Sequence, residues 1–232
     1  MTLHVIPVAG IGSVQPGDDV AALLAENLEP LEPQAGDVLV VTHKIVSKAE
    51  GAVRYIEGDE EEFKKGLVLA EAASIIRRRG DLIIAETKHG FICANAGVDR
   101  SNAEPGTMVL LPEDPDRSAH RLRSRLEHHF DVDLAVIISD TFGRPWRRGL
   151  TDIAIGVSGL VAVLDLKGMN DWSGRELEVT EIAVVDEIAS AADLVMGKAD
   201  GIPAALVRGY KGPRGNGRST DLVRPVDEDL FR

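Results

Sequence analysis

The stretch that most constrains the fold is an apolar run, residues 134–138, that ends abruptly in polar residues. The run is short, rich in β-branched side chains and bounded by a turn signal, which predicts a buried β-strand. Asp140 and Thr141 follow, and then a glycine and three arginines: Gly143, Arg144, Arg147 and Arg148. Ligands of open α/β sheets bind at the carboxyl ends of strands. A carboxylate beside a hydroxyl suits a hard cation such as Mg²⁺, and arginines suit a phosphate. Two interpretations stay open: a metal–phosphate site, or a core strand that runs into a solvated basic turn.

The composition limits the classes of function. Of the 232 residues, 44% are hydrophobic and 28% charged, as in a globular protein of one large or two small domains. A net charge of −12 and only 4% aromatic residues argue against nucleic-acid binding. The single cysteine, Cys93, is expected to be a small buried hydrophobic residue. The first residues lack a signal-peptide pattern, and no stretch approaches the ~18 apolar residues of a membrane span. We therefore expect a cytoplasmic protein that does not associate with membranes.

Hydrophobic periodicity predicts a mixed α/β fold with alternating strands and helices. The helix over 60–79 is the clearest, because it begins with acids and ends in Arg77, Arg78 and Arg79, as the helix dipole favours. The other expected helices span 20–28, 118–130 and 180–196. The expected strands span 5–8, 37–41, 82–86, 90–94, 107–111, 134–139, 152–157, 160–166 and 204–208.

Polar segments that contain glycine or lysine follow several of these strands. Such loops can build a nucleotide site together, because backbone amides and glycines admit phosphates, lysine and arginine neutralise them, and carboxylates hold Mg²⁺. The sequence contains no GxxxxGK[ST], GxGxxG, GxSxG or HExxH motif. Any chemistry therefore depends on a less common framework. The segments are 9–12, 42–48, 95–102, 140–148 and 197–203.

Two acids and two basic residues in these segments are the candidates for chemistry. Asp99 and Asp140 each follow an apolar segment, and converging carboxylates could bind one or two divalent ions. The alternative is that each aspartate caps its own turn. Lys48 could reach a phosphate and His43 could face a ligand, although most such residues are merely solvated.

Taken together, the segments resemble one family, the coenzyme F420-0:L-glutamate ligases, also called F420-0:γ-glutamyl ligases. The resemblance extends from residue 7 to about residue 209, in the family's order. It implies an α+β fold of that family and an intertwined homodimer. It also implies that GTP drives addition of L-glutamate to coenzyme F420-0 with the help of two divalent ions, Mg²⁺ or Mn²⁺, and of K⁺ as a further ion. The first glutamate would form an amide and later ones γ-linkages, through an acyl phosphate. The matching blocks are 36–51, 93–102, 138–149, 174–180 and 196–203.

Carried over residue by residue, the resemblance assigns a catalytic, metal-binding role to Asp99 and Asp140 at a first ion. Thr141 would be a ligand of a second ion. The residues expected to bind GTP are Ala9, Gly10, Ile11, Gly12, His43, Lys48, Asn102, Met196, Gly197, Lys198, Ala199, Asp200, Gly201 and Ile202.

The last of these loops departs from the family pattern. The resemblance implies that archaeal members carry a glutamate metal ligand where this chain has Lys198, and a protonated lysine cannot bind a metal. Three alternatives stay open. Asp200 substitutes for the glutamate, the second ion is held mostly by nucleotide and water, or Lys198 itself neutralises phosphate. Lys198 is therefore predicted to bind nucleotide and not metal.

The predicted ligase domain covers residues 1–210. Residues 211–232 form a basic, glycine-rich segment, expected to be mobile and to begin a linker toward the nitroreductase-like domain that some actinobacterial relatives carry. Two alternative functions remain: a nucleotide- or deazaflavin-binding protein without ligase activity, and a related amino-acid ligase that uses a modified F420 precursor.

Overall fold

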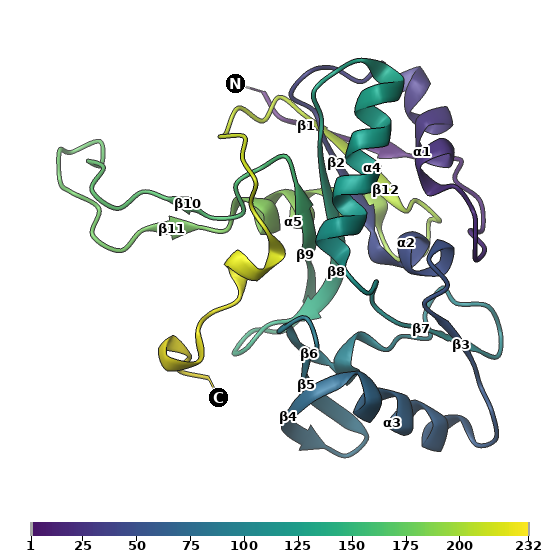
Figure 1. The fold of residues 1–232 in the computed structure, drawn as a ribbon. Coiled ribbons are helices and arrows are strands. Elements are labelled where there is room, and N and C mark those ends of the chain that lie inside the picture. The colour runs from purple at the N-terminus through teal and green to yellow at the C-terminus, as the bar shows by residue number, and fades with distance from the viewer. Residues whose placement is uncertain (1, 232) are drawn as a thin grey trace.

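A computed structural model describes residues 2–231 and shows a mixed α/β fold built on a five-stranded sheet (Figure 1). Strands β2 and β8 are parallel, whereas the pairs β1–β12, β12–β2 and β8–β9 are antiparallel. The mixed fold class is thereby confirmed. In spatial order the strands are β1 (His4–Val8), β12 (Ala204–Arg208), β2 (Val38–Thr42), β8 (Ala135–Gly143) and β9 (Leu150–Ser158).

Helices cover both faces of this sheet, because successive side chains of a strand point to opposite sides. In β2, Leu39 and Val41 face one apolar core, and Val38 and Val40 face the other; all four are fully buried. The first core lies under α1 (Val20–Leu28), α2 (His43–Ala49) and α4 (Pro115–Phe130). The second lies under α5 (Val184–Met196).

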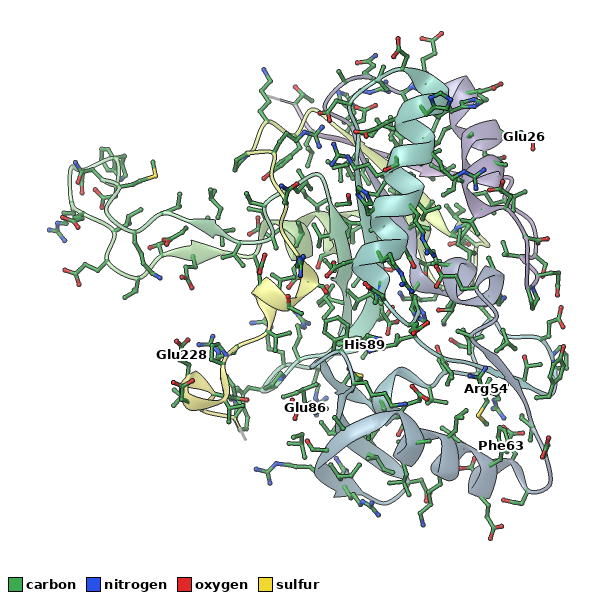
Figure 2. The ribbon with its side chains drawn as sticks, in the orientation of Figure 1. Glu26, Arg54, Phe63, Glu86, His89 and Glu228 are labelled. Carbon is green, nitrogen blue, oxygen red and sulfur yellow. The ribbon has the colours of Figure 1, made fainter. Side chains whose placement is uncertain are left out.

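A smaller unit packs below the main sheet in Figure 1. Its own core includes Val68, Ile83 and Met108, and Phe63, labelled in Figure 2, packs against it. This unit carries the 95–102 loop of the candidate site. Its elements are β3 (Val53–Tyr55), α3 (Glu60–Glu71), β4 (Ala72–Arg79), β5 (Leu82–Thr87), β6 (Ile92–Ala94) and β7 (Thr107–Val109). The short 3-10 turns are η1 (Glu29–Leu31), η2 (Asn95–Gly97), η3 (Ser219–Leu222) and η4 (Val226–Glu228).

The predicted helix over 60–79 is wrong in its second half. The helix ends at Glu71, and Ala72–Arg79 forms strand β4, paired antiparallel with β5. Ser74, Ile75 and Ile76 lie in this half, and β-branched residues fit a pleated strand better than a helix. The arginines at 77–79 therefore lie on a strand and do not end a helix.

Other boundaries also differ from the prediction: α4 starts at Pro115 rather than 118, β6 and β7 are shorter than expected, and β9 is longer. The 42–48 segment is not a loop but contains α2, since its Ile45 and Val46 are buried against the core. Helix α5 starts at Val184 rather than 180. Only Leu164–Asp165 of 160–166 is a strand. Strand β8 continues past 139 through Asp140 and Thr141 to Gly143, because β9 pairs beside it along that whole length.

A two-stranded arm projects from the body at the left of Figure 1. It consists of β10 (Leu164–Asp165) and β11 (Glu181–Ile182), with a further bridge between Asn170 and Glu176 near its tip. The side chain of Trp172 at this tip is fully exposed.

Part of the C-terminal segment is packed on the body, contrary to the expected mobility. Gly217 N donates to Leu160 O at 2.8 Å, and buried Ser219 donates through N and Oγ to Asp116. Glu228, labelled in Figure 2, lies further along this segment. The domain boundary at 210 stays a prediction. Within residues 2–231, the structure has no helix with the length and apolar character needed to span a membrane.

Candidate functional site

Most of the predicted segments lie at one edge of the main sheet. This edge is the one formed by the ends of the strands, and not by an outer strand. Val8 pairs with Ala204, Ala204 pairs with Val41, and Thr42 pairs with Ser139. The end of β1, the start of β12, the end of β2 and the middle of β8 therefore share this edge. It follows that the segments 9–12, 42–48 and 197–203 emerge beside Asp140 and Thr141.

Helix α2 begins at this edge, and its first residue faces Asp140. His43 Nε2 lies 3.3 Å from Asp140 Oδ1, and His43 Nδ1 lies 3.1 Å from Ser47 Oγ. The imidazole is only 1% exposed, and Nε2 is a buried nitrogen without an aligned hydrogen bond. The backbone N of Thr141 donates to Asp140 Oδ1 at 2.7 Å. A shielded carboxylate and an imidazole nitrogen thus face each other.

The next residue of α2 reaches Asp99 in the smaller unit. Lys44 Nζ lies 2.7 Å from Asp99 Oδ2 and donates to Ser101 Oγ at 2.6 Å. Ser101 in turn donates to Asp99 through N and Oγ. Burial raises the pKa of Asp99, but Lys44 and Ser101 outweigh it and lower that pKa to about 2. Asp99 is consequently ionised at neutral pH.

Lys48 lies one helical turn after Lys44 and joins the 95–102 segment to the last loop. Lys48 Nζ donates to Asn102 O at 2.6 Å, and Asn102 Nδ2 donates to Lys198 O at 3.4 Å. Burial lowers the pKa of Lys48. Two lysines of one helix face therefore border the same edge.

On the opposite face of β8, Thr141 belongs to a second polar group. Thr141 Oγ1 donates to Asp152 Oδ1 at 2.6 Å, and Lys198 Nζ donates to the same oxygen at 2.9 Å. Lys198 also pairs with Asp193 at 2.9 Å. Burial lowers the pKa of Lys198, but its bonds to Asp152 and Asp193 outweigh that and raise it. Strand alternation explains why Asp140 and Thr141, though adjacent, serve different groups.

The glycine loop after β1 is held tightly. Gly10 has a φ of +91°, and an added Cβ would come within 2.4 Å of Asn27 Oδ1, so only glycine fits there. The side chain of Ile11 is buried in the core, which leaves its backbone for any ligand. Gly12 has open space where a Cβ would be.

Comparison with known proteins decides the family. A sequence model described as F420-0:Gamma-glutamyl ligase matches residues 10–209. The chain belongs to the F420-0:γ-glutamyl ligase family. A protein of Methanopyrus kandleri named coenzyme F420:L-glutamate ligase is 46% identical, with 100% of this chain and 98% of that protein covered. Proteins of the same name from Methanocaldococcus jannaschii (45%, with 90% of each chain) and Methanothermobacter thermautotrophicus (42%, with 100% of each) are also similar. The resemblance read from the sequence is thus confirmed, and these relatives are ligase enzymes.

Within this ligase family member, the structure places the predicted residues in two groups. His43, Asp140, Asp99, Lys48 and Asn102 border α2, and Thr141 and Lys198 border α5. Asp99 pairs with Lys44, whereas Asp140 faces His43, so the two acids have different partners. Within residues 2–231, no three His, Cys, Asp or Glu side chains are grouped to hold a metal. Asp200 lies over Gly197, where a Cβ would come within 2.6 Å of its Oδ2.

Sequence reasoning missed Lys44, Ser101, Asp152 and Asp193. Asp152 carried a usable signal, because it is an acid at the first position of a predicted strand, and an acid is costly to bury without a partner. Cys93 is buried as expected; burial, and then the charge of Asp140, raises the pKa of its thiol to about 12. A thiol held neutral in this way is no nucleophile.

Proposed function

We propose that this chain adds L-glutamate to coenzyme F420-0, first through an amide and then through γ-linkages, with GTP as the phosphate donor. The observation that carries the proposal is that consecutive residues of α2 face the two predicted metal ligands: His43 faces Asp140, and Lys44 pairs with Asp99, inside the residues matched by the family model. The names of the similar proteins supply the substrate class.

The residues of the edge fit a divalent cation, Mg²⁺ or Mn²⁺. Carboxylates are the ligands that such cations prefer, and the buried His43 Nε2 facing Asp140 is a polar atom still lacking an aligned bond. Asp140 and Asp99 would hold the metal. When bound, it would hold the nucleotide phosphates and neutralise the charge that develops on them.

The chain's own side chains would supply the rest. Lys44 and Lys48 offer ammonium groups on one face of α2 for the phosphates, and the amides of residues 9–12 can approach them closely. A carboxylate is a poor electrophile until one of its oxygens becomes a leaving group. Transfer of the GTP γ-phosphoryl group to the F420-0 carboxylate breaks the bond between the β- and γ-phosphates of GTP and releases GDP. The glutamate amine then attacks the acyl carbon, and phosphate leaves.

Incubation of the protein with F420-0, L-glutamate, GTP and Mn²⁺, followed by mass spectrometry, tests this proposal. We expect a mass increase of one or more glutamate residues, and none when the metal is chelated or GTP is omitted. L-Aspartate in place of L-glutamate tests the related-ligase alternative. Stabilisation by GTP without any mass increase, beside an active control enzyme, would favour a binding protein and contradict the ligase proposal.

We also propose that the chain forms a homodimer through its projecting arm. The exposed apolar side chains Met169, Trp172 and Val179 lie on this arm, and exposed apolar surface marks interaction sites. Sedimentation equilibrium at micromolar concentration should give twice the chain mass. Trp172→Ser should weaken the dimer, whereas Tyr55→Ser, at an exposed aromatic of β3, should not. A wild-type monomer would contradict this proposal.

A further inference from the structure

We propose that the ammonium group of Lys198 takes the place of a second divalent cation beside Thr141, so that the enzyme works with one divalent ion per active site. This inference rests on the metal- and GTP-dependent activity proposed above. It starts from the polar group on the α5 side of the sheet.

Three oxygens from three elements surround Lys198 Nζ. Thr141 Oγ1 on β8 lies at 2.5 Å, Asp152 Oδ1 on β9 at 2.9 Å and Asp193 Oδ1 on α5 at 2.9 Å. The ammonium donates hydrogen bonds to Thr141 and Asp152, whereas Asp193 Oδ1 is ion-paired with it and is a buried oxygen without an aligned hydrogen bond. A hydroxyl and two carboxylates are also the ligands that a hard divalent cation selects.

The buried carboxylate of Asp152 holds the ammonium group of Lys198 in this position. Its side chain is 4% exposed, Ser139 Oγ donates to its Oδ2 at 2.9 Å, and Thr141 and Lys198 share its Oδ1. Ser190 Oγ donates to its backbone oxygen at 2.8 Å. Removal of the lysine charge would leave a buried carboxylate without a cation, which is strongly unfavourable. The ammonium is therefore the resident counter-ion.

A second divalent ion does not fit beside Thr141 while Lys198 is there. Mg²⁺ needs its oxygen ligands at about 2.0–2.1 Å. The same oxygens enclose Nζ, so an added ion would meet both steric exclusion and charge repulsion. Asp140 points to the other face of β8 and faces His43 instead. One divalent ion can thus be held on the face of β8 that carries Asp140. On the opposite face, the ammonium group of Lys198 supplies a charge of +1.

Lys198 lies at the surface, with a side chain that is 56% exposed, and its ammonium group reaches inward to Asp152. Its backbone oxygen also accepts from Asn102. The loop after α5 is thereby fixed at both its backbone and its side chain. A fixed ammonium needs no metal from solution, so the reaction rate should depend on the Mn²⁺ concentration to the first power.

The count of bound Mn²⁺ tests the inference. Electron paramagnetic resonance titration with Mn²⁺, in the presence of GDP, should give one ion per wild-type protomer. Lys198→Glu turns the same pocket into a hydroxyl with three carboxylates and should bind two. Lys65→Glu, at an exposed lysine of α3, makes the same charge change and should bind one. Added Mn²⁺ should raise the melting temperature more for Lys198→Glu than for Lys65→Glu.

Each outcome decides between the proposals. Two ions in the wild type would overturn this inference and leave the proposed ligase function standing. No bound Mn²⁺ in the wild type would overturn the proposed metal dependence and the inference with it. If Lys198→Glu does not fold, Lys198→Gln keeps the test open. It removes the ammonium without adding a carboxylate, and loss of the first-power Mn²⁺ dependence supports the inference. Unchanged dependence overturns it.

Discussion

Asp140→Asn is expected to remove nearly all turnover while the protein stays folded. The amide keeps the size of the carboxylate and can still accept the 2.7 Å bond from Thr141 N. It loses the negative charge that faces His43 at 3.3 Å and that would hold the divalent ion. Metal stabilisation of the developing phosphate charge contributes several kcal/mol. At 1.36 kcal/mol per tenfold change, we expect kcat to fall by about 10²–10³-fold.

The measurement pairs product formation with Mn²⁺ binding and circular dichroism. Asp81→Asn, at an exposed acid in the turn between β4 and β5, is the matched control and should retain activity. If Asp140→Asn kept turnover within about threefold of wild type, the metal assignment to this carboxylate would be wrong.

Of the substitutions discussed, Arg208→Met is expected to cause the largest loss in the free energy of unfolding. Asp37 is 1% exposed, and Arg208 donates to both its carboxylate oxygens at 2.8–3.1 Å. The same guanidinium donates to Leu31 O and Glu32 O. Its loss leaves a buried carboxylate without its cation, which costs about 3–5 kcal/mol. Arg208 is 23% exposed, so water can partly replace it and we expect about 3 kcal/mol.

Thermal and urea unfolding measure this loss. For a chain of this size, about 3 kcal/mol lowers the melting temperature by roughly 6–12 °C. Arg125→Met is the matched control, because Arg125 makes a similar two-oxygen contact with Asp19 but both side chains are about half exposed. An exposed pair contributes about 0–1 kcal/mol. Equal losses in the two variants would show that burial of Asp37 is not the cause.

The hydrophobic pattern correctly predicted the elements in which buried residues recur at regular spacing along the chain. The helix over 20–28 has the bounds that were expected, and the strands near 5–8, 37–41 and 204–208 lie in the main sheet. The prediction failed at Ala72–Arg79, where pairing with β5 overrides the helix begun at Glu60. That pairing joins separate segments, so no local window contains it.

The residues of the candidate site also fall into those that the sequence indicated and those that only the structure shows. Asp140, Asp99 and Lys48 stood out because they follow predicted buried strands, and ligands of α/β sheets bind at the carboxyl ends of strands. Their partners did not stand out, because Lys44 is an ordinary lysine in sequence and Asp193 an ordinary acid of an amphipathic helix. Only the contacts of α2 with the 95–102 segment, and the packing of α5 against β9, bring these side chains together.

The sequence by itself determined the family, most of the main strands and helices, and some of the polar segments that lie at the sheet edge. The tertiary structure alone decided that Asp140 and Thr141 face opposite sides of β8, and that Lys198 is the residue beside Thr141. The physical reason is that hydrophobic periodicity is a local property of the chain. The face that a strand residue occupies, and the ion that it meets there, depend on the register between β8 and β9 and on the distant helix α5 packed over them.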